Sequence, residues 1–346
     1  MKTILITGGC GFIGSNFIRY ALRRHPNWRI VNIDKLTYAG NRDNLKDIEH
    51  DERYTFIQGD ICDKQLVGQI FTDHKISGVI NFAAESHVDR SIMDATAFIE
   101  TNVKGTMILL DAARQYGVER FMQISTDEVY GELGETGVFT EESPLQPNSP
   151  YAASKASADL LVKSYIRTFS IPAIITRSTN NFGPYQYPEK LIPLMILNAE
   201  HDENLPVYGD GLNVRDWIYV EDNCAAIDNI FNEGNTGEIY NIGSGCELAN
   251  IDVVRKILDV LGKPDTLIKF VKDRPGHDRR YALDNTKIIK ETSWKPSRSF
   301  DERLTETIVW YKENDSWWRP LLTRDYNEYR KNIYGEASTF NEKSKA

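Results

Sequence analysis

The chain has 346 residues, of which 41% are hydrophobic and 26% charged, and its formal net charge is -9 at pH 7. This length and composition are those of a globular protein with a large core, and they exclude an intrinsically disordered chain. The acidic balance argues against nucleic acid or an anionic membrane as the main partner, because both attract basic surfaces.

Two further features bear on location. No apolar run approaches the roughly 18 residues of a membrane span, and the first expected strand begins almost at Met1, which leaves no room for a signal peptide. The four cysteines are widely scattered and have no metal-ligand spacing: Cys10, Cys62, Cys224 and Cys246. We therefore expect free thiols in a cytoplasmic protein and no metal site.

The first strand leads into a glycine-rich turn. Residues 2–7 are apolar and β-branched, which predicts a buried strand, and residues 15–24 have helical periodicity. Between them, Gly8, Gly11 and Gly14 have the spacing of a dinucleotide-binding turn, where backbone approaches a pyrophosphate at a helix N-terminus. By itself the pattern also fits an ordinary glycine-rich turn between a strand and a helix.

The next strand favours the cofactor interpretation. Residues 29–33 form a second apolar strand that ends at Asp34, about twenty residues beyond the last glycine. A carboxylate at this point accepts hydrogen bonds from the adenosine ribose and repels a 2′-phosphate, so the sequence predicts NAD rather than NADP. Lys35 follows directly and could tolerate a phosphate, which leaves the preference incomplete.

Strand and helix patterns continue to alternate. Further strands are expected at 54–59, 78–84 and 119–124, with a long helix at 102–116. This alternation predicts an α/β fold, a doubly wound parallel Rossmann-type sheet with its site beyond the carboxyl ends of the strands. His87 lies in a polar loop, where a structural hydrogen bond is a simpler role than catalysis.

The strand at 119–124 runs into a hydroxyl and two carboxylates, at Thr126, Asp127 and Glu128. Hydride transfer alone needs no such pair. Neighbouring buried carboxyls raise each other's pKa, so one can be protonated while the other is ionised, as elimination of water requires. Elsewhere in a chain the same pair could be a solvated acidic loop. For Tyr130 we expect a packing or hydrogen-bonding role.

A helix expected from Pro150, capped by Ser149, carries Tyr151 and Lys155 one turn apart on the same face. The lysine ammonium and an oxidised nicotinamide both favour the phenolate, which would lower the pKa of Tyr151 from near 10. Tyr151 could then take a proton from a substrate hydroxyl held by Thr126. Without the preceding dinucleotide motif, an amphipathic helix with a surface lysine would be the simpler interpretation.

The regular alternation breaks down after residue 181. We predict an NAD-binding Rossmann domain over 1–181 with a return near 217–245, a smaller mixed α/β substrate lobe mainly over 182–330, and a frayed tail at 335–346. In an acidic protein an anionic ligand needs a local cluster of cations.

These motifs together resemble the extended short-chain dehydrogenase/reductases, and within them the dTDP-glucose 4,6-dehydratase family. The similarity covers about residues 1–330 and rests on the segments 7–14, 34–41, 83–90, 125–131, 151–155 and 273–281. It implies a homodimer that holds NAD tightly, with dTDP-glucose as the substrate and a place in dTDP-rhamnose or other deoxysugar biosynthesis.

The resemblance also implies a mechanism. Tyr151 deprotonates the sugar 4-hydroxyl while hydride passes from C4 to NAD. The 4-keto group acidifies the C5 proton, which Glu128 removes, and Asp127 protonates the departing 6-hydroxyl. The hydride then returns to C6 and gives a 4-keto-6-deoxy sugar. The implied catalytic residues are Thr126, Asp127, Glu128, Tyr151 and Lys155.

Two sets of ligand contacts follow from the same resemblance. The expected NAD contacts are Gly8, Gly11, Phe12, Ile13, Gly14, Asp34, Lys35, Leu36, Thr37, Asp60, Ile61, Phe82, Ala83, Ala84, Glu85, Ser86, Thr101, Tyr151, Lys155 and Asn181. The expected substrate contacts are Ser86, Thr126, Asn180, Lys190, Leu191, Pro206, Val207, Tyr208, Arg215, Asn250, Asp273, Arg274, Pro275, Gly276 and His277. The residues themselves support the cations Lys190, Arg215 and Arg274 as diphosphate ligands.

Three alternatives stay open. A nucleotide-sugar 4-epimerase would need Tyr151 and Lys155 but no ionisable pair at Asp127 and Glu128. Another NDP-hexose 4,6-dehydratase, such as a GDP-mannose type, would also have a base at Glu128. The additional acid at Asp127 argues against this type. A catalytically dead NAD-sensing binding protein typically loses the tyrosine or the lysine, and both are present here.

Overall fold

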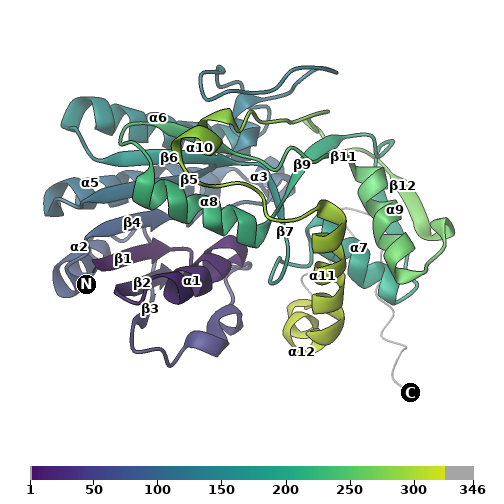
Figure 1. Cartoon of the computed structure of the whole chain (residues 1–346), viewed down its shortest axis with the longest axis horizontal. Coiled ribbons are helices and arrows are strands. Elements are labelled where there is room, and N and C mark those ends of the chain that lie inside the picture. The colour runs from purple at the N-terminus through teal and green to yellow at the C-terminus, as the bar shows by residue number, and fades with distance from the viewer. Residues whose placement is uncertain (1, 324–346) are drawn as a thin grey trace.

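The protein is built on a seven-stranded parallel sheet (Figure 1), seen in a computed structural model that describes residues 2–323. The tail expected at 335–346 lies outside these residues. The strand order is β10-β6-β5-β4-β1-β2-β3. The strands are β1 (Lys2–Thr7), β2 (Trp28–Asp34), β3 (Tyr54–Gln58), β4 (Gly78–Asn81), β5 (Arg120–Thr126), β6 (Ala173–Ser178) and β10 (Ile239–Ile242). The predicted doubly wound α/β fold is confirmed.

Helices cover both faces of this sheet. One face carries α1 (Phe12–Arg24), α8 (Val220–Glu233) and α10 (Thr286–Glu291), and the other carries α2 (Lys64–His74), α5 (Thr106–Tyr116) and α6 (Pro150–Phe169). Successive residues of a strand point to opposite faces. Ile4 and Ile6 therefore enter one core and Leu5 the other, and each such burial contributes about 1.5–3 kcal/mol.

The long helix expected at 102–116 begins earlier and is not regular. After α3 (Val88–Met93), helical structure starts with α4 (Thr96–Phe98) and passes through a π-helical segment, η2 (Ile99–Gly105), into α5. Inside η2, the buried Asn102 side chain bonds both the backbone N–H and the carbonyl of Glu85, at 2.9 and 3.0 Å. A buried amide needs such partners. Helical periodicity in the sequence does not reveal these two hydrogen bonds.

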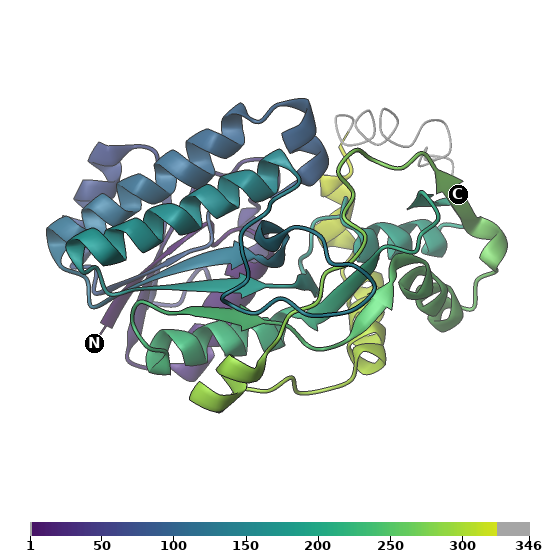
Figure 2. The same cartoon turned by 90° about the horizontal axis from the view of Figure 1, so that it is seen from above.

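A second group of elements stands beyond the carboxyl ends of the large sheet (Figure 2). It contains a three-stranded sheet in the order β11-β9-β7 and a two-stranded sheet, β12-β8, around a core of their own. The strands are β7 (Asn180–Phe182), β8 (Leu205–Tyr208), β9 (Val214–Tyr219), β11 (Glu247–Ala249) and β12 (Ile268–Val271). The helices are α7 (Leu191–Glu200), α9 (Asn250–Leu261), α11 (Phe300–Glu313) and α12 (Asp315–Trp318).

Short 3-10 turns complete the fold at η1 (Arg42–Ile48), η3 (Asp127–Tyr130), η4 (Asp265–Leu267) and η5 (Arg319–Leu321). All four cysteines are free thiols. Across residues 2–323 no helix has the length and apolar character needed to cross a membrane. In the same range no group of His, Cys, Asp and Glu side chains could hold a metal ion.

Candidate active site

A cavity of about 320 Å³ opens where the strands of the large sheet end. Every expected NAD contact except Leu36 lines it, and so do all five expected catalytic residues. Leu36 instead turns away with a positive φ of 57°, and its backbone N–H bonds Asp34 at 2.8 Å. The fold thus brings the two predicted groups of residues into a single cavity.

The glycine turn has no room for side chains. Gly8 has φ +67°, and a Cβ atom there would lie 2.7 Å from the backbone nitrogen of Ala83. A Cβ atom on Gly14 would lie 2.5 Å from the Gly8 carbonyl oxygen. Close backbone approach and the N-terminus of α1 therefore meet at the cavity wall, as a pyrophosphate site requires.

Asp34, the last residue of β2, lines the same cavity. One carboxylate oxygen accepts from the Cys10 N–H at 2.9 Å and the other from Leu36, while burial raises the pKa of the group. Each oxygen keeps a further lone pair for a ribose hydroxyl. The neighbouring Lys35 is engaged with Asp60, with its Nζ 2.7 Å from Oδ2. These residues fit a dinucleotide with free ribose hydroxyls better than one with a 2′-phosphate.

The carboxylate pair begins where β5 ends. Thr126 caps the following turn, because its Oγ1 accepts from the Glu128 N–H at 3.3 Å and donates to Asp127 Oδ1 at 3.2 Å. Burial, followed by the charge of Glu128, raises the pKa of Asp127 to about 7. Burial also raises the pKa of Glu128, but cations oppose it there, in the order Arg274, Arg215 and Lys190. The pKa of Asp127 is thus raised by a neighbouring carboxylate, whereas three cations act on Glu128, an arrangement that suits an acid beside a base.

Tyr151 and Lys155 reach the same cavity from the first turns of α6, which Ser149 caps through the Ala152 N–H at 3.1 Å. The Lys155 ammonium donates to the Ile124 carbonyl at 2.6 Å, and burial lowers its pKa to about 8. For Tyr151, burial and then the charges of Glu128 and Asp127 raise the pKa of the phenol. The lowering expected from Lys155 together with an oxidised nicotinamide is not seen with the chain's own groups alone, because burial and then the two carboxylates oppose a phenolate.

Tyr130 supports the turn from outside the cavity. Its hydroxyl donates to Asn241 at 2.7 Å, and its ring stacks on Phe139 with centroids 5.0 Å apart. The guanidinium of Arg177 lies 4.7 Å from the same ring and pairs with buried Asp159 at 2.9 Å. Tyr130 has the packing and hydrogen-bonding role that its position suggested.

Some cavity residues were missed by sequence reasoning. Tyr38, Tyr187 and Glu189 also line the cavity, and burial raises the pKa of Glu189. His87 Nε2 lies 3.5 Å from Glu189 Oε1 but outside the cavity lining, and burial lowers the pKa of His87 far enough to keep it neutral. Tyr38 falls inside the segment 34–41 and Glu189 directly precedes Lys190, so proximity to matched residues was the available signal.

The expected substrate residues divide into two groups. Lys190 lines the cavity and donates to the Ser86 carbonyl at 3.3 Å, and Asn180, Ser86 and Thr126 line it as well. The other group lies in the second lobe, outside the cavity lining: Leu191, Pro206, Val207, Tyr208, Arg215, Asn250, Asp273, Arg274, Pro275, Gly276 and His277. The side chain of Val207 is buried in the core of that lobe, so only its backbone can face a ligand.

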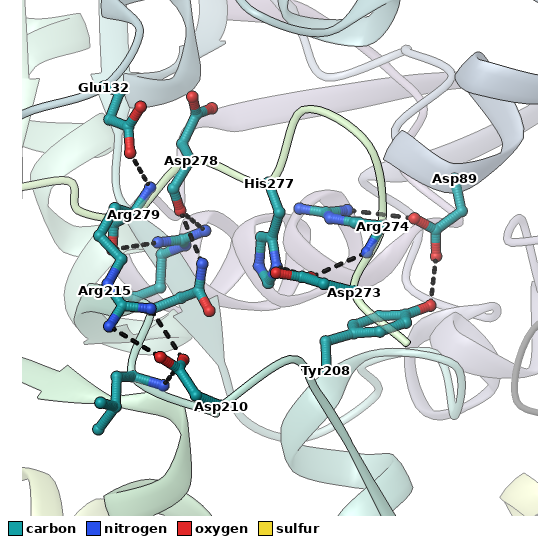
Figure 3. A network of polar contacts seen from close by, with 12 residues as sticks. Asp89, Glu132, Tyr208, Asp210, Arg215, Asp273, Arg274, His277, Asp278 and Arg279 are labelled. Atoms are coloured by element: carbon teal, nitrogen blue, oxygen red, sulfur yellow. Dashed lines mark hydrogen bonds and ion pairs between the residues drawn. The ribbon is translucent and has the colours of Figure 1, made fainter. Parts of the chain in front are cut away.

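A polar network organises this second group (Figure 3). Arg215 is buried and donates to the Asp278 carbonyl at 2.8 Å, and its guanidinium lies 4.4 Å from the Tyr281 ring centroid. Arg279 pairs with Asp210 at 2.8 Å, while its backbone N–H bonds Glu132, two residues beyond the η3 turn. The loop around residues 273–280 is therefore joined to both lobes.

A parallel sheet with a glycine turn at its first strand, and a tyrosine and lysine one helical turn apart in the same cavity, define the class of short-chain dehydrogenase/reductases. A family model described as GDP-mannose 4,6 dehydratase matches residues 5–307, and the chain belongs to this family.

Known relatives cover nearly the whole chain. It is 54% identical over 312 residues to a low-salt glycan biosynthesis protein of Haloferax volcanii, covering 90% of this chain and 99% of that protein. It is 48% identical over 347 residues to the dTDP-glucose 4,6-dehydratase of Neisseria meningitidis, covering 94% and 98%. The solved dTDP-glucose 4,6-dehydratase DesIV of Streptomyces venezuelae, with NAD bound, superposes with a TM-score of 0.90 at 48% identity, covering 92% and 99%.

Proposed function

We propose that the protein converts dTDP-glucose into dTDP-4-keto-6-deoxy-glucose with the loss of water, an NAD-dependent hydro-lyase step of deoxysugar biosynthesis. The observation that carries this proposal is the carboxylate pair Asp127–Glu128 in one cavity with Tyr151 and Lys155. The 48% identity to dTDP-glucose 4,6-dehydratases supports the sugar nucleotide as substrate.

NAD is the cofactor. The glycine turn around Gly8 would hold its diphosphate and Asp34 its adenosine ribose, and the ring end of the cavity is lined by Tyr151 and Lys155. When bound, NAD accepts a hydride from the sugar and later returns it. The reaction is therefore redox-neutral overall, and the only net loss is one water molecule.

The chain's own residues move the protons. Tyr151, with Thr126 on the same hydroxyl, takes the proton of the sugar 4-hydroxyl, and the Lys155 ammonium and the oxidised nicotinamide together would favour its anion. Once C4 is a ketone the C5 proton is acidic, and ionised Glu128 removes it. Protonated Asp127 gives its proton to the 6-hydroxyl, which departs as water while a C5–C6 double bond forms. The proton held by Glu128, or one exchanged for it from solvent, would then return to C5 when C6 regains the hydride. The unequal environments of the two carboxyls suit this division of acid and base.

We also propose a division of labour between the lobes. Residues 1–181, with a return near 217–245, would bind NAD, and residues 182–330 would mainly bind the nucleotide sugar. Arg215 is buried beside a carbonyl and Arg274 is half-buried beside a carboxylate. These positions support both as diphosphate ligands, because bidentate guanidinium groups suit phosphate oxygens.

A cytoplasmic homodimer completes the proposal. The four free thiols suit a reducing compartment. The adjacent helices α5 and α6 expose large side chains, including Met107 at 37%, Leu160 at 56% and Phe169 at 43%, which would suit burial against a second copy. Light scattering on the purified protein tests the mass, and a monomer at working concentration would contradict the dimer.

Incubation with dTDP-glucose in deuterated water tests the activity. NMR of the product should show a new C6 methyl group, a ketone at C4 and deuterium at C5. Recovery of the C4 epimer would favour the epimerase alternative instead. No reaction by protein that contains NAD would favour a binding protein with a dead site.

A further inference from the structure

Asp89 joins the two lobes beside the expected diphosphate ligands, yet it has no role in the proposed chemistry. It lies on α3, which packs against α6 in the first lobe, and its side chain is buried. One carboxylate oxygen lies 3.3 Å from Nη1 of Arg274, and the other accepts from the Tyr208 hydroxyl at 3.2 Å (Figure 3). A single carboxylate thus connects α3, the end of β8 and the loop after β12.

The contact with Asp89 uses only Nη1 of Arg274, so other N–H groups of the guanidinium can bind a ligand. Its Nε is buried and makes no hydrogen bond within residues 2–323. A buried donor without an acceptor is costly, so an acceptor at this position would be favoured. Arg274 is also the first of the cations whose charge lowers the pKa of Glu128. The charge of Arg274 is therefore felt at the carboxylate pair, although its side chain lies outside the cavity lining.

Asp89 is the side chain that fixes this arginine. Arg274 lies in a loop whose neighbours Asp273, Pro275 and Gly276 are exposed. The other contacts of the loop anchor its backbone and its other side chains: His277 Nδ1 lies 2.6 Å from Asp273 Oδ1. An arginine side chain carries about 2 kcal/mol of rotamer entropy, and the contact with Asp89 removes part of this freedom before any ligand binds.

We propose that Asp89 is a positioning residue for the nucleoside diphosphate, holding Arg274 so that its Nε and remaining N–H groups face the diphosphate oxygens. The inference rests on the proposed function, because it takes Arg274 as a diphosphate ligand. It also predicts the direction in which ligand affinity changes when Asp89 is neutralised. A carboxylate near an anion repels it, so electrostatics alone predicts tighter binding after Asp89 is neutralised, whereas positioning predicts weaker binding.

Calorimetric titration of the full-length protein, with NAD bound, measures how Asp89 variants change the affinity for dTDP. Steady-state kinetics is measured alongside. Asp89→Asn should weaken dTDP binding about tenfold, with a similar rise in KM for dTDP-glucose and a smaller change in kcat. Asp89→Glu keeps the charge but displaces it, and should also weaken binding. Asp252→Asn, at an exposed Asp–Arg pair on α9, should change nothing.

A double-mutant cycle separates positioning from general stability. In an Arg274→Met background, Asp89→Asn should no longer weaken dTDP binding, because the group that Asp89 positions is gone. Equal or tighter dTDP binding by both Asp89 variants would overturn the inference, as would the same tenfold loss in the Arg274→Met background. If Asp89→Asn does not fold, Asp89→Glu decides. Wild-type protein that binds dTDP but does not convert dTDP-glucose would contradict the proposed function and leave this inference standing.

Discussion

Two regions hold their charged groups in different ways. We call residues 126–130 the catalytic turn, because they carry the proposed acid and base, and residues 273–280 the diphosphate loop, because they carry the proposed ligand Arg274. The turn places Thr126, Asp127 and Glu128 consecutively at the end of a central strand, and α6 adds two residues four positions apart. The loop places Arg274 against Asp89, 185 residues away in sequence, and leaves several of its neighbours exposed. Backbone elements fix the first region, while the second is held by the Asp89–Arg274 ion pair between the lobes and the Arg279–Asp210 pair within the second lobe. Changes in the turn should therefore affect kcat, and changes in the loop should affect binding.

Tyr151→Phe should have the largest effect. It removes the group that takes the 4-hydroxyl proton, so kcat should fall about 1000-fold, within the range of general base catalysis, and no reduced cofactor should form. Tyr165→Phe is a matched control on the same helix, because that hydroxyl bonds Asp111 outside the cavity. A Tyr151→Phe enzyme with near-normal turnover would show that another group is the base.

Asp127→Asn should lower kcat about 100-fold, because an amide cannot give its proton to the departing hydroxyl. The pKa of Asp127 is about 7, so its protonated fraction falls as pH rises through 7. Turnover limited by elimination should therefore decline above about pH 7 in the wild type. The variant should lose this limb of the pH–rate profile. A variant that keeps the same decline would assign it to a different group.

Arg215→Lys should have the smallest effect. It keeps the charge but loses the planar fork that bonds the Asp278 carbonyl and lies over Tyr281. KM for dTDP-glucose should rise about tenfold and kcat should change much less. Arg255→Lys, at an exposed position on α9, is the control. If Arg215→Lys mainly reduced kcat, the assignment of turnover to one region and substrate binding to the other would be wrong.

The catalytic turn could be predicted from sequence because its determinants are local. Apolar runs gave the strands, glycine spacing gave the turn at Gly8, and the four-residue spacing put Tyr151 and Lys155 on one face. The carboxyl ends of the parallel strands lie at the same edge of the sheet, so the residues that follow them lie close together. Nothing beyond short-range pattern was needed for this part of the site.

The remaining features depend on tertiary contacts. Neither Tyr38 nor Glu189 has a sequence pattern that shows it will line the cavity. The π-helical segment contains Asn102, whose side chain bonds the backbone of Glu85, 17 residues away, and no periodic pattern shows this contact. The pKa of Tyr151 also depends on burial near two carboxylates. The Asp89–Arg274 contact joins residues 185 positions apart, and no periodic pattern in the sequence predicts it.

The central claim is that Asp127 and Glu128 convert an oxidising site into a dehydrating one. Mixing Glu128→Gln protein, loaded with NAD, with dTDP-glucose tests it most directly, by following reduced-cofactor absorbance and the C6 methyl signal together. Oxidation at C4 should proceed and reduced cofactor should accumulate, while almost no methyl product forms. Methyl product at the wild-type rate would contradict the claim, because Glu128 could not then be the base that removes the C5 proton.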